Sequence, residues 1–245
     1  MKCRSACVMT VWIAVITLLR AGDAPLPYIV WDGHRFAQTA ADRERDVRYF
    51  RDLGFTHSLI GGRLDTEKLR PDIRALFDAC SCYGLRPGLR YGWDTDKLAE
   101  KLGGYDAMKK SGAYFYKGKS DTSLDFNPIH PQVINTYAKM IGDSVRGHRR
   151  FDKDNTIQLF LIGSERTWGL PKEKKISSAA RKAILDAARA DGVWKDGDTD
   201  WQKLSTWWGS PKGRGGDWRL RRAIAEEVRK EIPDARRVPP ALRRR

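Results

Sequence analysis

The sequence is poor in cysteine, which excludes a fold held together by a disulfide framework. Four cysteines occur in 245 residues, and Cys3 and Cys7 fall within an N-terminal segment that is expected to be removed. Cys80 and Cys82 remain, on an expected helix. Residues two apart on a helix point in different directions, so a bond between them is disfavoured and both are predicted to be buried or free thiols. No further ligand is spaced to complete a zinc site.

Histidine is also scarce, and the short motifs of common cofactor sites are missing. His34, His57, His130 and His148 have no metal-ligand spacing. The sequence contains no G-x-G-x-x-G, P-loop, H-E-x-x-H or G-x-S-x-G motif, which removes the usual signatures of nucleotide-binding proteins, zinc proteases and serine hydrolases. We therefore expect neither a cofactor nor a metal.

No apolar run is long enough to span a membrane comfortably. The run at residues 6–19 is shorter than the roughly 20 residues that cross a bilayer. It follows Lys2 and Arg4 and precedes small residues at 21–24, which is the pattern of a secretory signal. Residues 1–24 are predicted to be a signal peptide, with an uncleaved anchor as the alternative. The mature chain is then secreted or periplasmic, without stable membrane insertion.

Acidic residues are outnumbered, with 31 Asp and Glu against 46 Lys and Arg and a net charge of +15. An excess of basic residues is typical of proteins that bind nucleic acid. Both signs alternate along most expected helices, however, and the one concentrated basic block is the tail at 236–245, which is expected to be disordered. Nucleic-acid binding is therefore disfavoured, and polyanion binding through the basic surface is kept as the weaker option.

Short apolar segments alternate with amphipathic ones through most of the chain. Strands are predicted at residues 28–31, 55–60, 85–91 and 156–162, and helices at 40–53, 66–83, 96–110, 131–145, 177–190 and 217–232. This alternation indicates an α/β fold with a mostly parallel sheet. The last strand is short and apolar, which is typical of a strand buried on both faces. A long insertion is expected at 194–216.

Acids and tryptophans follow the expected strands. Right-handed crossovers bring the carboxyl ends of parallel strands to one edge of a sheet. That edge would collect Trp31-Asp32 with His34, Arg63, Trp93-Asp94, and Ser164-Glu165 with Trp168. Aromatic faces are common in carbohydrate sites, although any one tryptophan could fill core instead. Each Asp taken alone could also be a helix cap or a turn residue.

The fourth strand, ending in Glu165, resembles the strand that carries the acid/base glutamate in the (β/α)8 barrels of clan A glycoside hydrolases. The sequence most resembles family 42 β-galactosidases, and this resemblance rests on residues 125–131 and 157–168. This resemblance covers about residues 28–232. It implies hydrolysis of O-glycosidic bonds with Glu165 as general acid/base. The implied carbohydrate-binding residues are Trp31, Asp32, His34, Arg63, Trp93, Asp94, Ser164 and Trp168.

The sequence departs from that family in two ways. Ser164 stands where the family usually has an Asn beside the acid/base, and the chain ends before the strand that would carry the nucleophile. Residues 25–235 are thus predicted to form an incomplete TIM-barrel-like (β/α) domain of about four βα units. Because a half barrel exposes its sheet edges, we expect either a homodimer that completes the sheet or a truncated product of a longer gene.

Two functions follow, and both have a carbohydrate as the partner. The first is a secreted glycoside hydrolase-like protein, active or inactive, with Glu165 as general acid/base. Its second carboxylate is missing unless Asp32 or Asp94 takes that role. The second is a non-catalytic carbohydrate-binding or half-barrel remnant protein that uses Trp31, Trp93 and Trp168 as stacking platforms.

Overall fold

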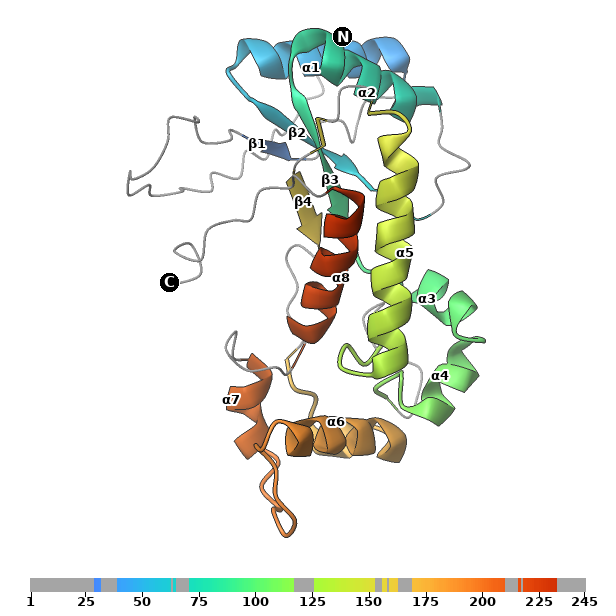
Figure 1. The fold of residues 1–245 in the computed structure, drawn as a ribbon, viewed down its shortest axis with the longest axis vertical. Coiled ribbons are helices and arrows are strands. Elements are labelled where there is room, and N and C mark those ends of the chain that lie inside the picture. Colours follow the sequence, from blue (N-terminus) through green and yellow to red (C-terminus); the bar gives the residue numbers. More distant parts are fainter. Residues whose placement is uncertain are drawn as a thin grey trace, which may run out of the picture.

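The computed structural model is an α/β fold built on a four-stranded parallel sheet (Figure 1). The strands are β1 (Ile29–Trp31), β2 (His57–Gly61), β3 (Arg86–Tyr91) and β4 (Leu159–Ile162), and they lie in the order β1-β2-β3-β4. The structure describes residues 29–31, 39–62, 64, 71–116, 126–152, 156–157, 159–162, 169–209, 216 and 218–232. The predicted α/β class, the parallel sheet and all four strands are confirmed.

Helices follow every strand. They are α1 (Ala40–Asp52), α2 (Pro71–Tyr83), α3 (Thr95–Lys101), α4 (Tyr105–Ser111), α5 (Pro131–Arg149), the 3-10 turn η1 (Glu173–Lys175), α6 (Ser178–Ala190), α7 (Lys203–Gly209) and α8 (Trp218–Glu231). The single helix predicted at 96–110 is wrong, because Gly103 and Gly104 adopt φ angles of 84° and 95° and separate α3 from α4. Helix α7 lies inside the region that was predicted to be an insertion.

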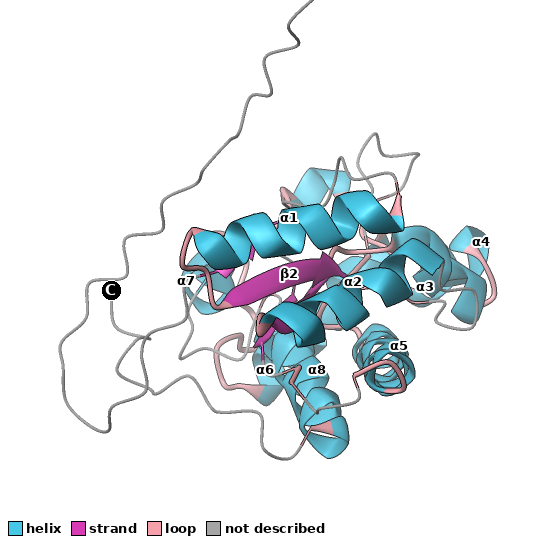
Figure 2. Cartoon of the chain, turned by 90° about the horizontal axis from the view of Figure 1, so that it is seen from above, coloured by secondary structure: helices cyan, strands magenta, loops and turns pink. Residues whose placement is uncertain are grey.

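One hydrophobic core lies between the sheet and the long helices α1, α2, α5 and α8 (Figure 2). These helices pack on the same face of the sheet. The register pairs Ile60 with Leu89, and both side chains belong to this core. Side chains alternate between faces along a strand, so Leu59 points to the opposite face. Leu59 is buried but does not join the core cluster. The sheet thus has a helix face and a second, distinct face.

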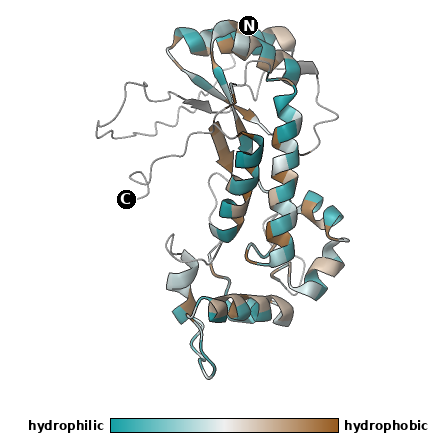
Figure 3. Cartoon of the chain, in the orientation of Figure 1, coloured by the Kyte–Doolittle hydropathy of each residue, from teal (hydrophilic) through white to brown (hydrophobic). Residues whose placement is uncertain are grey.

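Strand β4 is hydrophobic along its length (Figure 3), yet every one of its side chains is partly exposed. In the described part of the chain, β4 pairs with β3 alone, so it lies at an edge of the sheet. A parallel strand of this composition is normally covered on both sides, and the prediction that this one is buried on both faces is wrong.

A chain of buried polar groups joins β3 to α5 within this core. The hydroxyl of Tyr91 lies 2.9 Å from Oγ of Ser144, and Nδ1 of His148 donates to the Ser144 carbonyl over 2.8 Å. Burial raises the pKa of Tyr91, which keeps the phenol neutral. His148 is therefore a satisfied core residue, as its lack of metal-ligand spacing indicated.

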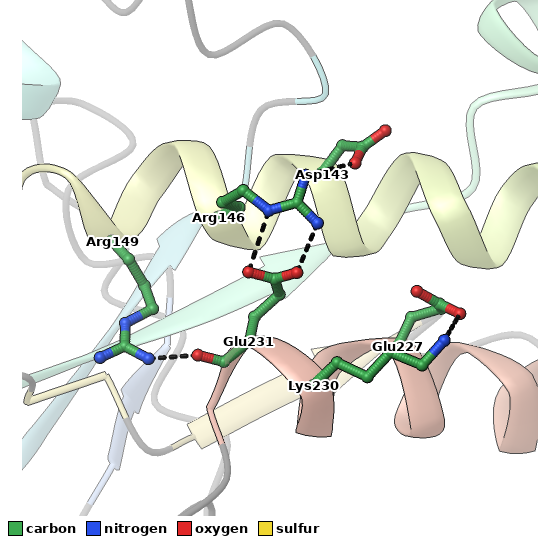
Figure 4. A network of polar contacts seen from close by, with 6 residues as sticks. All are labelled: Asp143, Arg146, Arg149, Glu227, Lys230 and Glu231. Atoms are coloured by element: carbon green, nitrogen blue, oxygen red, sulfur yellow. Dashed lines mark hydrogen bonds and ion pairs between the residues drawn. The ribbon is translucent and has the colours of Figure 1, made fainter.

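Helices α5 and α8 pack side by side along most of their length (Figure 1). A polar network crosses their outer surface, where Arg146 donates to both carboxylate oxygens of Glu231 and Arg149 donates to the Glu231 carbonyl (Figure 4). Exposed ion pairs contribute at most about 1 kcal/mol. The association therefore depends mainly on the buried inner faces, which include Ile141 and Ile224, both fully buried.

The shorter helices form a second layer beyond the carboxyl ends of the strands (Figure 1). Trp194, Trp207 and Trp208 are buried in this layer at 4%, 5% and 2% exposure. The indole of Trp207 donates to Asp191 over 2.9 Å, and Arg219 pairs with the other Asp191 oxygen at 2.7 Å. Much of the tryptophan content therefore fills core rather than lining a ligand site.

The two thiols outside the N-terminal segment are free, as predicted. Cys80 is buried and Cys82 is exposed. Burial raises the pKa of the Cys80 thiol to about 12, so it remains protonated at neutral pH. Among the described residues, no helix is both long and apolar enough to cross a membrane.

The approach to β4 is anchored by a buried carboxylate. Asp152 is 7% exposed and accepts hydrogen bonds from the amide and hydroxyl of Thr156 and from the amide of Ile157, over 2.8, 2.7 and 2.8 Å. Asp152→Ala is expected to lower the free energy of unfolding by about 2–4 kcal/mol, because these donors lose a charged acceptor. Urea unfolding measures the change.

The matched control for this prediction is Asp143→Ala. Asp143 forms an exposed ion pair with Arg146, and its side chain is 50% exposed. Its removal is expected to change the unfolding free energy by less than about 1 kcal/mol. Equal losses in the two variants would contradict the anchoring role of Asp152.

Candidate functional site

The carboxyl ends of the strands meet at one edge of the sheet, and this edge is the candidate site. The strands end there at Trp31, Gly61, Tyr91 and Ile162. Of the residues predicted to bind carbohydrate, the structure brings Trp93 and Asp94 to this edge, directly after β3. For Trp31, it describes only the backbone, at the end of β1.

Trp93 is half-buried and held by aromatic rings. Its ring centroid lies 5.5 Å from that of Tyr137 and 5.9 Å from that of Phe126, and these two rings stack on each other at 5.6 Å. The guanidinium of Arg221 lies over the Trp93 ring, 5.4 Å from its centroid. Trp93 is therefore fixed in place, and a cation occupies one of its faces. A ligand at this position would meet both an indole and a guanidinium.

Arg221 joins the ends of β3 and β4 from a distant part of the chain. It comes from the first turns of α8 and donates to the carbonyl of Ile162, the last residue of β4, over 2.5 Å. Arg221 is not among the site residues predicted from the sequence. A signal was present, because Arg219, Arg221 and Arg222 lie at the start of a helix with no acid in its first turn. Cations are unfavourable at that end of the helix dipole, which suggests that they have another role.

Asp94 acts as the N-cap of α3. Its side chain accepts a hydrogen bond from the amide of Lys97 over 2.9 Å. This is the structural role left open for each aspartate in the sequence. In this conformation, one carboxylate oxygen is engaged by the helix.

Tyr137 holds the turn between β3 and α3. Its hydroxyl accepts from the amide of Asp94 over 2.7 Å and donates to the carbonyl of Gly92 over 3.2 Å. Burial raises the pKa of Tyr137, so the phenol stays protonated and can make both bonds. Tyr137→Phe is expected to cost about 1–3 kcal/mol of unfolding free energy, measured by urea denaturation, because both backbone groups lose their partner.

Tyr105→Phe is the control for that prediction. The hydroxyl of Tyr105 donates to the carboxylate of Asp96 at 2.6 Å, but at an exposed position where water can replace it. The expected cost is below about 0.5 kcal/mol, as for most surface substitutions. A Tyr137→Phe variant as stable as Tyr105→Phe would show that the turn does not depend on the hydroxyl.

The other predicted site residues lie outside the described residues. They are Asp32, His34, Arg63, Ser164, Glu165 and Trp168. Glu165 follows the end of β4 by three residues, and Asp32 follows the end of β1 directly. Their roles therefore remain predictions.

No other part of the described chain competes clearly with this edge. Within these residues, no group of three His, Cys, Asp or Glu side chains is arranged to hold a metal ion. A shallow hollow of about 370 Å³ lies between α2 and the segment before β4, and Phe77, Cys82 and Phe151 are among its lining residues. Both segments lead into the amino ends of strands, so this hollow is at the opposite edge of the sheet. The sequence matches no protein family and no curated protein in comparison searches.

Proposed function

We propose that this protein acts on carbohydrate at the carboxyl edge of its sheet, as a secreted glycoside hydrolase-like protein with Glu165 as the general acid/base. The fold behind this proposal is half of a TIM-barrel-like (β/α) domain. The observation that carries it is the sequential parallel order β1-β2-β3-β4 with the long helices on one face, because this is the arrangement within a (β/α)8 barrel.

The make-up of the edge supports a polar, aromatic ligand site. Active sites of such barrels lie at the carboxyl ends of the strands. Trp93 offers an aromatic surface there, and Arg221 adds a hydrogen-bond donor that already reaches the end of β4. Glu165 lies three residues beyond that end, and three residues span at most about 11 Å. The acid/base is therefore within chain reach of Trp93 and Arg221.

A non-catalytic carbohydrate-binding protein is the second candidate, and Asp94 favours it. Hydrolysis of a glycoside requires two carboxyl groups, about 5–9.5 Å apart. Asp94 is committed to the N-terminus of α3, where it accepts from Lys97. Using it as a base or nucleophile would uncap the helix. Within a single chain, the described residues therefore supply no second carboxylate at this edge.

Assay of the wild-type chain with a panel of alkyl glycosides, followed by glycan binding in the same buffer, separates the two candidates. Turnover that is lost in Glu165→Gln supports the hydrolase. Binding without turnover, unchanged in Glu165→Gln and weakened in Trp93→Ala, supports the binding protein. A chain that neither binds nor cleaves any glycan would exclude both.

A further inference from the structure

The hollow between α2 and the segment that joins α5 to β4 lies at the amino edge of the sheet, opposite the candidate site. Its volume of about 370 Å³ falls at the small end of ligand pockets, which measure roughly 300–1,000 Å³. Two phenylalanine rings, Phe77 and Phe151, and two carboxylates, Asp78 and Asp152, are among its lining residues. The hollow is therefore large enough for a small molecule and combines aromatic with acidic surface.

One of the two carboxylates is buried and held in place. Asp152 is 7% exposed, and Oδ1 accepts from the amide and the hydroxyl of Thr156, while Oδ2 accepts from the amide of Ile157. These amide and hydroxyl donors carry no charge, so they orient the carboxylate without neutralising it. A carboxylate oxygen can accept two hydrogen bonds, and Oδ2 receives one of them from the described residues. Asp152 thus brings a fixed negative charge to the wall of the hollow.

The rest of the lining favours a cation as well. Asp78 lies on the exposed surface of α2, next to the buried ring of Phe77. The ring of Phe151 already attracts a cation of the chain, because the guanidinium of Arg74 lies 4.9 Å from its centroid. Of the described residues that line the hollow, none is basic, although the whole chain carries a net charge of +15.

We propose that this hollow binds a small organic cation, an amine that carries an aromatic or alkyl group. The ammonium pairs with Asp78 and Asp152, and the apolar group lies against the ring of Phe151. An ammonium donates three hydrogen bonds and accepts none, which suits a pair of carboxylates. A metal ion fits less well, because no three His, Cys, Asp or Glu side chains of the described residues are arranged to hold one. This site is independent of the function proposed for the carboxyl edge.

Cys82 makes occupancy of the hollow measurable. It lines the hollow and is exposed, whereas Cys80 is buried. Alkylation of Cys82 in the full chain by iodoacetamide, a neutral reagent, is followed by peptide mass spectrometry while 2-phenylethylamine is added at constant ionic strength. The bound amine covers the thiol and should suppress its alkylation, and the concentration dependence gives Kd. Phenylacetate and 2-phenylethanol should bind at least about tenfold more weakly, because they lack the charged donor.

Two substitutions should shift this Kd in opposite directions. Asp78→Asn removes a carboxylate and should weaken binding of 2-phenylethylamine about two- to fivefold, the range for an exposed ion pair. Arg74→Gln removes a competing positive charge beside Phe151 and should tighten binding by about the same factor. The control is Asp106→Asn, which removes an exposed charge from α4, away from α2 (Figure 1), and should leave Kd unchanged. Circular dichroism checks that each variant is folded.

The outcomes separate a cation site from a merely apolar hollow. Protection of Cys82 by the amine, weakened in Asp78→Asn and strengthened in Arg74→Gln, supports the proposal. Equal protection by 2-phenylethylamine and 2-phenylethanol overturns the assignment to a cation, as does a Kd that is the same in Asp78→Asn and the wild type. Absence of protection by the amine overturns the site itself. None of these results depends on whether the chain hydrolyses a glycoside.

Discussion

Glu165→Gln is expected to reduce kcat for glycosides with poor leaving groups by about 10²–10⁴-fold, the usual contribution of a positioned general acid. Glutamine keeps the size of the side chain but cannot donate a proton to the glycosidic oxygen. Alkyl glycosides have leaving groups that need this proton. The comparison of kcat between the wild type and the variant, with an alkyl glycoside as substrate, measures the effect.

The leaving group separates acid catalysis from a general loss of structure. The dinitrophenolate group leaves without protonation, so cleavage of a dinitrophenyl glycoside should be nearly insensitive to Glu165→Gln. The fall of kcat at high pH should also disappear from the pH profile of the variant, because the group that must stay protonated is gone. An equal loss for both leaving groups, with the pH profile unchanged, would contradict the assignment of Glu165 as the acid.

Glu226→Gln is the control for this experiment. Glu226 is an exposed residue of α8, and its substitution removes the same charge from the same protein. Its kcat should equal that of the wild type with both substrates. Identical losses in the two variants would point to an effect of net charge rather than of proton transfer.

The order of strands and helices was predictable because it depends on local patterns. Helix α8 follows from the spacing of Leu220, Ile224 and Val228, all of which face the core. Ser177 caps α6 by accepting from the amide of Ala180, three residues along the chain. These features involve neighbours in the sequence, so the chain carries them without knowledge of the tertiary structure.

Strand β3 was predictable in spite of its local composition. Pro87 and Gly88 are poor strand residues, but both are buried in the middle of the sheet. Gly88 is required because Leu59 and Leu159 pack across it, where a Cβ would collide. The flanking apolar residues dominated the pattern, while the reason for the glycine comes from two other strands and could not be read locally.

The content of the candidate site was only partly predictable. Trp93 and Asp94 follow a strand and were therefore selected. Tyr137 and Arg221 lie on α5 and α8, far along the chain from Trp93. Only the fold brings them to it. The sequence also did not show that Trp194, Trp207 and Trp208 fill the second helical layer, because their burial depends on contacts with distant parts of the chain.

Phe126→Ala is expected to lower the free energy of unfolding by about 3–5 kcal/mol, as for other fully buried phenylalanines. Phe126 has no exposed surface, and its ring stacks on Tyr137 at 5.6 Å and meets the edge of Trp93 at 5.9 Å. Its removal leaves a cavity beneath the candidate site and loses both ring contacts. Urea unfolding gives the loss in stability, and a shift in tryptophan fluorescence is expected as Trp93 becomes more exposed to water.

Two further variants show whether the effect belongs to the aromatic cluster. Tyr105→Ala removes an aromatic ring that is 38% exposed, and should cost well below half as much, because less of it leaves water on folding. Phe126→Leu keeps most of the volume and should restore much of the stability, but not the ring contacts that orient Trp93. If Phe126→Ala and Tyr105→Ala are equally stable, the ring beneath Trp93 does not support the site, and the position of Trp93 must depend on Tyr137 and Arg221.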